Sequence, residues 1–208
     1  MSSKEKKLTV ETSVKDEQLI VTRRKQIVSA AIELFRVKGF HPTTTREIAK
    51  AAGFSIGTLY EYIRSKDDVL YLVCDSIFDE VTNKIAVFQQ ADQTIEQLKE
   101  AIGVYYRLID EMLDEFTIMY QETKSMPKEA MHYILNKELE MVSIFERLIA
   151  NSVEGLSEGE IFAAANAIVV QGQSWAFRKW ALHKHFTIDQ FIEYNTNLAL
   201  QGLLNLKK

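Results

Sequence analysis

Apolar residues recur at intervals of three and four along most of the chain, which is the period of a helix with one buried face. The clearest stripe comprises Ile95, Leu98, Ile102, Tyr105, Tyr106, Ile109 and Leu113. A shorter stripe comprises Ile27, Ala31, Leu34 and Phe35. No segment shows the strict apolar-polar alternation of a half-buried strand. The pattern therefore predicts an all-α protein of about nine helices.

Residues that begin and end helices divide this pattern into elements. Thr44 with Glu47, and Thr187 with Gln190, match the capping box, in which two side chains bond the free backbone groups of the first turn. Ser55 and Ser157 match single N-caps, while Gly39 and Gly53 match helix ends. The predicted helices cover residues 22–38, 45–52, 55–63, 66–83, 95–113, 117–124, 127–150, 157–183 and 187–206.

Three regions follow from this division. Residues 1–16 are polar and without periodicity, so we expect a disordered tail over 1–18. A three-helix domain is expected over 19–66, and a larger helical domain for ligand binding and dimerisation over 67–208. The scarcity of glycine (eight) and proline (two) agrees with long helices and few turns.

The protein is expected to be soluble and cytoplasmic. Its one cysteine, Cys74, cannot form an internal disulfide, which suits a reducing compartment. Residues 1–15 lack the apolar core of a secretory signal. No apolar run reaches the roughly 20 residues that span a bilayer, so no membrane contact is expected.

Charge is distributed unevenly along the chain. The net charge is −4, but residues 22–66 carry +6 and residues 67–208 carry −10. A basic region followed by an acidic body is typical of a polyanion-binding module joined to a regulatory domain. Chance clustering of solvated charges explains the same numbers equally well, so charge alone does not decide the function.

The helices predicted over 45–52 and 55–63, joined by residues 52–55, have the size and spacing of a DNA-reading helix-turn-helix. Gly57 lowers helix stability by roughly 1 kcal/mol relative to alanine. Such a residue makes sense where a sugar-phosphate chain approaches the backbone closely. Neighbouring hydroxyls and phenols can bond phosphates without adding charge, namely those of Ser55, Thr58, Tyr60 and Tyr62.

About 50 consecutive residues resemble the N-terminal domain of TetR-family repressors in order and spacing. They include residues 24–27 and 31–35, Gly39-Phe40, Thr43-Thr44-Thr45, residues 48–53, Gly57-Thr58-Leu59-Tyr60, Tyr62 and residues 65–70. Ile63 departs from the family, which usually has an aromatic residue there. Beyond this region the chain resembles the family only in length and helix number.

The resemblance implies that residues 55–62 enter the major groove and that Thr43, Thr45 and Arg46 touch phosphates. It implies that Lys66 clamps the DNA backbone. The expected contacts to operator DNA are Thr43, Thr44, Thr45, Arg46, Ser55, Ile56, Gly57, Thr58, Tyr60, Glu61, Tyr62 and Lys66.

The resemblance also implies a homodimer on a palindrome, assembled through the last two helices of each subunit. Small side chains that permit close helix approach agree with this: Ala163, Ala164, Ala165, Ala167 and Gly172. Apolar area comes from Ile161, Ile168, Phe191, Leu198 and Leu203. The alternative is that these residues form the core of a single subunit.

Family members bind a small effector in the larger domain, so an apolar pocket is expected there. Its expected lining is Tyr105, Tyr106, Phe116, Tyr120, His132, Met141, Gln171 and Trp175. Ordinary core packing is the alternative for each residue. The segment 175–180 combines two indoles with Arg178 and Lys179, which would suit an acyl thioester of coenzyme A. Solvated cations at a helix end explain the same residues more simply.

An enzyme is not expected, because the chain offers no nucleophile with a base, no second cysteine for zinc and no phosphate-binding glycine loop. No metal or cofactor is expected. The sequence therefore predicts a ligand-responsive DNA-binding transcriptional regulator, a repressor released by a small apolar effector. The alternative is a helical protein-interaction module without DNA binding.

Overall fold

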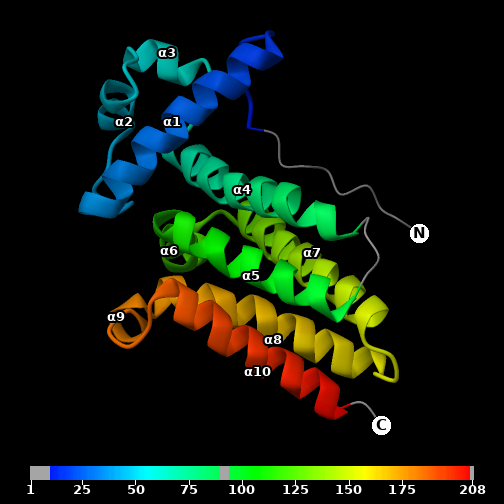
Figure 1. The fold of residues 1–208 in the computed structure, drawn as a ribbon. Coiled ribbons are helices and arrows are strands. Elements are labelled where there is room, and N and C mark those ends of the chain that lie inside the picture. Colours follow the sequence, from blue (N-terminus) through cyan, green and yellow to red (C-terminus); the bar gives the residue numbers. More distant parts are fainter. Residues whose placement is uncertain (1–9, 90–93, 207–208) are drawn as a thin grey trace. The chain divides into compact units, whose positions relative to one another are not determined.

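The computed structural model describes residues 10–89 and 94–206, and these residues contain helices but no strand (Figure 1). The α-helices are α1 (Glu17–Lys38), α2 (Thr45–Ala51), α3 (Ile56–Tyr60), α4 (Lys66–Ile85), α5 (Ile95–Glu111), α6 (Leu113–Glu122), α7 (Lys128–Ser152), α8 (Glu158–Phe177), α9 (Lys179–Leu182) and α10 (Ile188–Leu206). Two 3₁₀ turns lie at Ala86–Gln89 and Thr123–Ser125. The prediction of an all-α fold is confirmed.

The described residues contain ten α-helices, close to the predicted nine or so. The additional helix arises because the helix predicted over 157–183 is interrupted at Arg178. The chain folds back there. The ring of His183 stacks on Trp175 with centroids 4.0 Å apart, and its Nε2 lies 3.2 Å from the Trp175 carbonyl oxygen. These contacts need the turn that separates α8 from α9.

The expectation of a disordered tail over 1–18 is wrong for residues 10–18, while residues 1–9 lie outside the described residues. Asp16 caps α1 by accepting a 3.0 Å bond from the Leu19 N–H. Residues 10–16, here called the N-terminal strap, are held by long-range bonds. Thr12 Oγ1 donates to the Glu61 carbonyl at 2.7 Å, and Val10 is 4% exposed.

The chain divides into two compact units. Within the described residues, the head unit comprises 10–76 and 118–135, and the body unit comprises 77–89, 94–117 and 136–206. This division differs from the predicted boundary after residue 66, because the first part of α4 and the segment 118–135 belong to the head unit. None of the helices in the described residues is long and apolar enough to cross a membrane.

In the head unit, α1 packs on α2 and α2 packs on α3. The apolar stripe of α1 faces this core, as predicted: Ile27 and Ala31 are fully buried and Phe35 is 4% exposed. Ile48 from α2 and Leu59 from α3 are also fully buried. The three helices are thus held together by a small apolar centre, and their polar sides face solvent.

In the body unit, α5 packs against both α8 and α10, and α8 packs against α10. A Cβ on Gly172 would lie 2.7 Å from Tyr106 Cδ1 and 2.8 Å from Tyr105 Cε1. The close approach that Gly172 permits is therefore one between α8 and α5 of a single subunit. For Gly172, and for the buried Ala165, Ile168, Phe191 and Leu203, the intramolecular alternative holds.

Candidate nucleic-acid interface

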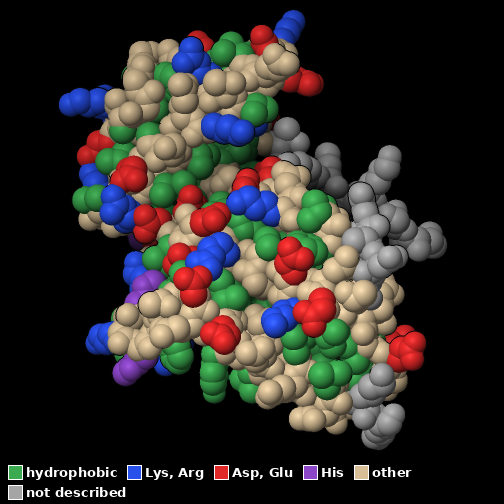
Figure 2. All heavy atoms as spheres, viewed as in Figure 1, with side chains coloured by type: hydrophobic (Ala, Val, Ile, Leu, Met, Phe, Trp, Pro, Cys, Tyr) green, Lys and Arg blue, Asp and Glu red, His purple; other side chains and the backbone are tan. Residues whose placement is uncertain are grey.

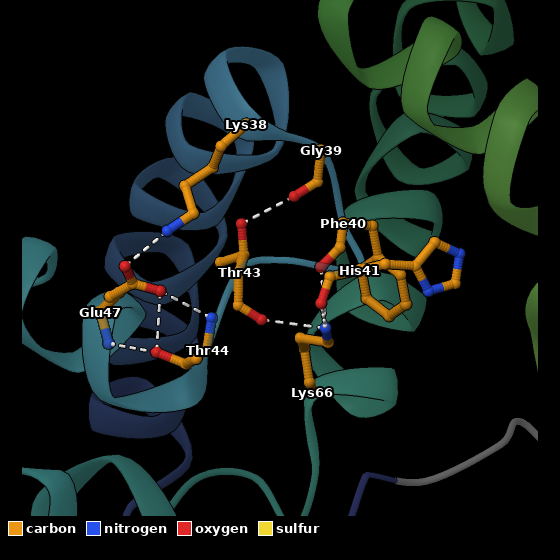
Figure 3. Close-up of polar contacts among 8 residues, drawn as sticks. All are labelled: Lys38, Gly39, Phe40, His41, Thr43, Thr44, Glu47 and Lys66. Atoms are coloured by element: carbon orange, nitrogen blue, oxygen red, sulfur yellow. Dashed lines mark hydrogen bonds and ion pairs between the residues drawn. The ribbon is translucent and has the colours of Figure 1, made fainter.

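The start of α2 is fixed by the predicted capping box (Figure 3). The Glu47 N–H donates to Thr44 Oγ1 at 3.3 Å, and the Thr44 N–H donates to Glu47 Oε2 at 2.9 Å. Lys38, the last residue of α1, donates to Glu47 Oε1 at 2.5 Å. Hydrogen bonding from Lys38, supported by Thr44, lowers the pKa of Glu47 to about 2. The carboxylate thus joins the end of α1 to the beginning of α2.

The start of α3 is fixed by Ser55, also as predicted: its Oγ accepts a 3.0 Å bond from the Thr58 N–H. The helix is shorter than the predicted 55–63, since Glu61 already caps its end. Leu59 anchors the inner side and is fully buried. The outer side is exposed, and it comprises Ser55, Ile56, Gly57, Tyr60 and Glu61.

Gly57 on this outer side is not required by packing within the chain. The nearest atom to a Cβ built there is Ser55 Oγ at 3.7 Å, an ordinary contact distance. This differs from Gly172, where neighbouring side chains leave no space. The space above Gly57 is open, which agrees with the predicted close approach of another molecule to the backbone.

A hydrogen bond joins the outer sides of α2 and α3. Thr45 Oγ1 and Tyr60 Oη lie 3.1 Å apart. Tyr60 is 47% exposed, Thr45 is half-buried and Arg46 beside it is exposed. These side chains form one polar surface that combines hydroxyl groups with a cation, the groups that bond phosphates.

Three of the twelve predicted DNA contacts have a different role in the structure. Thr43 is 2% exposed, and its Oγ1 donates to the Gly39 carbonyl at 2.8 Å. Tyr62 is 3% exposed and packs near Phe54, so its phenol faces the interior. The Lys66 ammonium donates to three backbone carbonyls of the head unit. Residue type alone did not reveal these partners, of which the carbonyls bound by Lys66 lie 23–26 residues away.

Arg24 has a structural role that neither its charge nor the family resemblance predicted. Its Nη2 donates to the Val10 carbonyl at 2.6 Å and to the Tyr62 carbonyl at 3.1 Å. Burial lowers the pKa of Arg24, and the Coulombic effect of Asp68 opposes that change. Arg24 therefore joins the N-terminal strap to the segment that follows α3.

The positive charge of the head unit therefore has two uses. Arg24 and Lys66 point inward to carbonyls, whereas Lys25, Arg46 and Lys50 are exposed. Lys and Arg side chains protrude from the surface over α1, α2 and α3 (Figure 2). Only the outward group contributes directly to a surface for polyanions, so the formal +6 of residues 22–66 exceeds the charge available to DNA.

The eight residues expected to line an effector pocket do not gather at one place. Five are buried in the body unit: Tyr105, Tyr106, Phe116, Met141 and Trp175. Tyr120 and His132 are exposed and belong to the head unit. Gln171 is exposed and donates to Asn195 Oδ1 at 2.9 Å. Trp175 is fixed by a 2.8 Å bond from its Nε1 to Asp110 Oδ1, which favours the core interpretation.

Two grooves of the body unit differ in character. One of about 610 Å³ runs between α8 and α10 and is lined mostly by small and apolar side chains, among them Ala163, Ala167, Leu198 and Gly202. Tyr106 and Gln171 also line it. Another of about 840 Å³ lies over α5 and α10 and is lined largely by charged side chains. The apolar groove is the better match to a protein or apolar partner.

The profile of bacterial regulatory proteins of the tetR family matches residues 27–71, which include α2, the turn and α3. The transcriptional regulator HbdR of Aromatoleum sp. (strain CIB) is 30% identical over 214 residues, covering all of this chain and 90% of HbdR. The chain belongs to the TetR family. The transcriptional repressor KstR2 of Rhodococcus jostii is 24% identical over 87% of this chain and 91% of its own length.

The fold agrees with this membership. A structure described as AibR in complex with isovaleryl coenzyme A and operator DNA superimposes with a TM-score of 0.70 at 18% identity, covering 85% of this chain and 97% of AibR. The chain is therefore a DNA-binding transcriptional regulator and not an enzyme, since its family consists of regulators. The alternative of an interaction module without DNA binding is not favoured.

Proposed function

We propose that the protein represses transcription as a homodimer on a palindromic operator and leaves the DNA when an acyl thioester of coenzyme A binds. The outer side of α3 carries this proposal. Its base-reading residues are Ile56, Thr58 and Glu61, with Gly57 leaving room for the DNA backbone. Its phosphate-binding neighbours are Thr44, Thr45, Arg46, Ser55 and Tyr60.

Homodimerisation is supported by the surface of α8 and α10. Large apolar side chains are left exposed there: Phe162 (47%), Val170 (47%), Tyr194 (58%), Leu198 (58%) and Leu204 (51%). Of these, Leu198 lines the apolar groove, whose alanines and Gly202 allow helices to approach closely. A second copy of α8 and α10 packed against the groove would bury it together with Leu198. Two α3 helices related by a two-fold axis then read two halves of a palindrome.

The effector class is supported by similarity. AibR, which shares the fold, is described as a complex with isovaleryl coenzyme A. In this chain Trp175 is buried and bonded to Asp110, while Trp180 is 67% exposed. The segment 175–180 thus does not present both indoles to one ligand, and the proposal does not depend on that segment.

Operator binding is tested by retaining genomic fragments on the purified protein at moderate salt and sequencing them. We expect a palindromic fragment to be enriched, with protection on two adjacent major-groove faces. Replacing Tyr60 by phenylalanine removes one phosphate bond and should weaken binding uniformly across sequences. Retention of no specific fragment would contradict the proposal.

The effector is tested on the same fragment by adding isovaleryl coenzyme A or longer acyl thioesters, with free coenzyme A and the free acids as controls. We expect an acyl thioester, but neither control, to release the DNA. Mass spectrometry of ligands that co-purify gives an independent result. Release by a neutral molecule alone would reject the thioester class and leave operator binding intact.

The dimer is tested by light scattering on Leu198→Glu. This change places a charge on the proposed contact surface, so we expect a monomer with weakened operator binding. Val87→Glu is the matched control, because Val87 is similarly exposed (62%) but lies outside α8 and α10. A Leu198→Glu protein that remains dimeric would show that another surface forms the dimer.

A further inference from the structure

The first residue of α4 enters a ring of carbonyl oxygens formed by the turn between α1 and α2 (Figure 3). Lys66 Nζ donates to the carbonyls of Phe40 at 2.8 Å, His41 at 2.9 Å and Thr43 at 2.9 Å. A lysine ammonium has three N–H donors and no more. All three are used inside the protein, so none remains for a DNA phosphate in this arrangement.

The turn that receives Lys66 is itself well fixed. Phe40 is 5% exposed, and its ring centroid lies 4.3 Å from Lys66 Nζ, which places the cation against an aromatic face. The buried Thr43 hydroxyl donates to the Gly39 carbonyl at 2.8 Å. Gly39 has a φ of 83°, a conformation that glycine adopts without strain. His41 Nε2 also lies 3.4 Å from Glu122 Oε2 of α6.

We infer that Lys66 is a positioning residue that fixes the α1–α2 turn to the start of α4, and that it acts on DNA through this turn and not by binding phosphate. The turn leads directly into the Thr44 cap, Thr45 and Arg46. A shift of the first turn of α4 would therefore move the phosphate-binding end of α2 with it.

The residue type matters for this role. A lysine ammonium is a compact point charge with three divergent donors, whereas an arginine guanidinium is a planar fork. Three carbonyls converging from one tight turn match the ammonium. Arginine would retain the charge but would not fit among the same oxygens. A phosphate contact has the opposite preference, since arginine binds phosphate at least as well as lysine.

The salt dependence of DNA affinity separates the two roles. Loss of a phosphate contact reduces the slope of log affinity against log salt by about 0.9, hence about 1.8 for a dimer. We expect Lys66→Met to weaken binding to a random-sequence duplex at least about tenfold at each salt concentration, because charge-assisted bonds are lost, with the slope unchanged. Lys66→Arg should not restore affinity. Arg46→Met is the matched control and should reduce the slope.

A measurement without DNA keeps the inference independent of the proposed operator. Amide hydrogen exchange over residues 39–47 should be faster in both Lys66 variants than in the wild type, and unchanged in Arg46→Met. The inference would be overturned if Lys66→Met lowered the slope as Arg46→Met does and Lys66→Arg bound like the wild type. It would also be overturned by unchanged exchange in both Lys66 variants. If Lys66→Met fails to fold, Lys66→Arg carries the same test.

Discussion

The head and body units reach their structures by different means. In the head unit, polar side chains complete backbone hydrogen bonds: Thr44 and Glu47 at α2, Ser55 at α3, and Arg24 at the segment after α3. In the body unit, large apolar side chains fit around a close helix crossing at Gly172. In the head, side-chain hydrogen bonds thus supplement a small apolar centre, whereas this helix crossing in the body depends on the shape of its apolar side chains. We therefore expect the body unit to be sensitive to changes in side-chain volume and the head unit to be sensitive to the loss of side-chain hydrogen bonds.

The largest effect is expected for Gly172→Val in the body unit. Even a single added carbon would lie 2.7–2.8 Å from Tyr105, Tyr106 and Ile109 of α5, so α8 must move. Overpacking of this kind lowers the free energy of unfolding by about 1–3 kcal/mol. Calorimetry should show a lower melting temperature. Gly159→Ala in the first turn of α8, where nothing lies within 4 Å of the new carbon, is the control that should not destabilise.

Arg24→Met tests the head unit by the same logic. It leaves the carbonyls of Val10 and Tyr62 without their donor, and we expect a loss of about 2 kcal/mol in the free energy of unfolding. Hydrogen exchange should quicken in the N-terminal strap and around Tyr62, with little change in the body unit. The exposed Lys25, replaced by methionine, controls for the loss of charge. Equal effects of both variants would mean that charge, not bonding, stabilises this region.

Gly57→Ala should separate stability from function. Alanine raises helix stability by up to about 1 kcal/mol relative to glycine, and the structure has room for the added carbon. The same carbon stands on the surface expected to meet DNA. We expect a slightly higher melting temperature together with an affinity for the selected operator about tenfold lower. A variant that binds as well as the wild type would show that DNA does not approach this backbone closely.

The smallest effect is expected from Glu47→Gln, and it depends on pH. The pKa of Glu47 is lowered from 4.5 to about 2, chiefly by the Lys38 bond. A depressed pKa means that the stabilisation is present above 4.5 and is lost as the pH falls toward 2. The melting temperature of the wild type should exceed that of the variant at neutral pH, and the two should converge in acid. A constant difference would indicate that the carboxylate charge is not involved.

Structural features that depend on residues close together in the sequence, such as helix caps, were predicted correctly. The caps at Thr44, Ser55 and Ser157 bond groups within three residues, and the structure has each of them. The motif of the head unit was recognisable for the same reason. The break at Arg178 was missed because no glycine or proline stands there; the His183 ring stacks on Trp175 across the break.

Hydrogen-bond partners that are far apart in the sequence could not be predicted from it. Lys66 looked like a phosphate ligand because its carbonyl partners lie 23–26 residues away. The N-terminal strap looked disordered because Thr12 bonds a carbonyl 49 residues away. Tyr105 and Tyr106 share one apolar stripe, and such a stripe does not distinguish a pocket wall from a core. Only the packing against Gly172 does.

Trp175 and Trp180, the only two tryptophans of the chain, both lie in the body unit. Trp175 is 2% exposed with its indole nitrogen bonded to Asp110, whereas Trp180 is 67% exposed. Tryptophan fluorescence, excited selectively, therefore reports on the body unit alone, with one emitter shielded from water and one in contact with it. Tyrosine and backbone signals include the head unit as well, so the two halves of the regulator can be followed separately without attaching a dye.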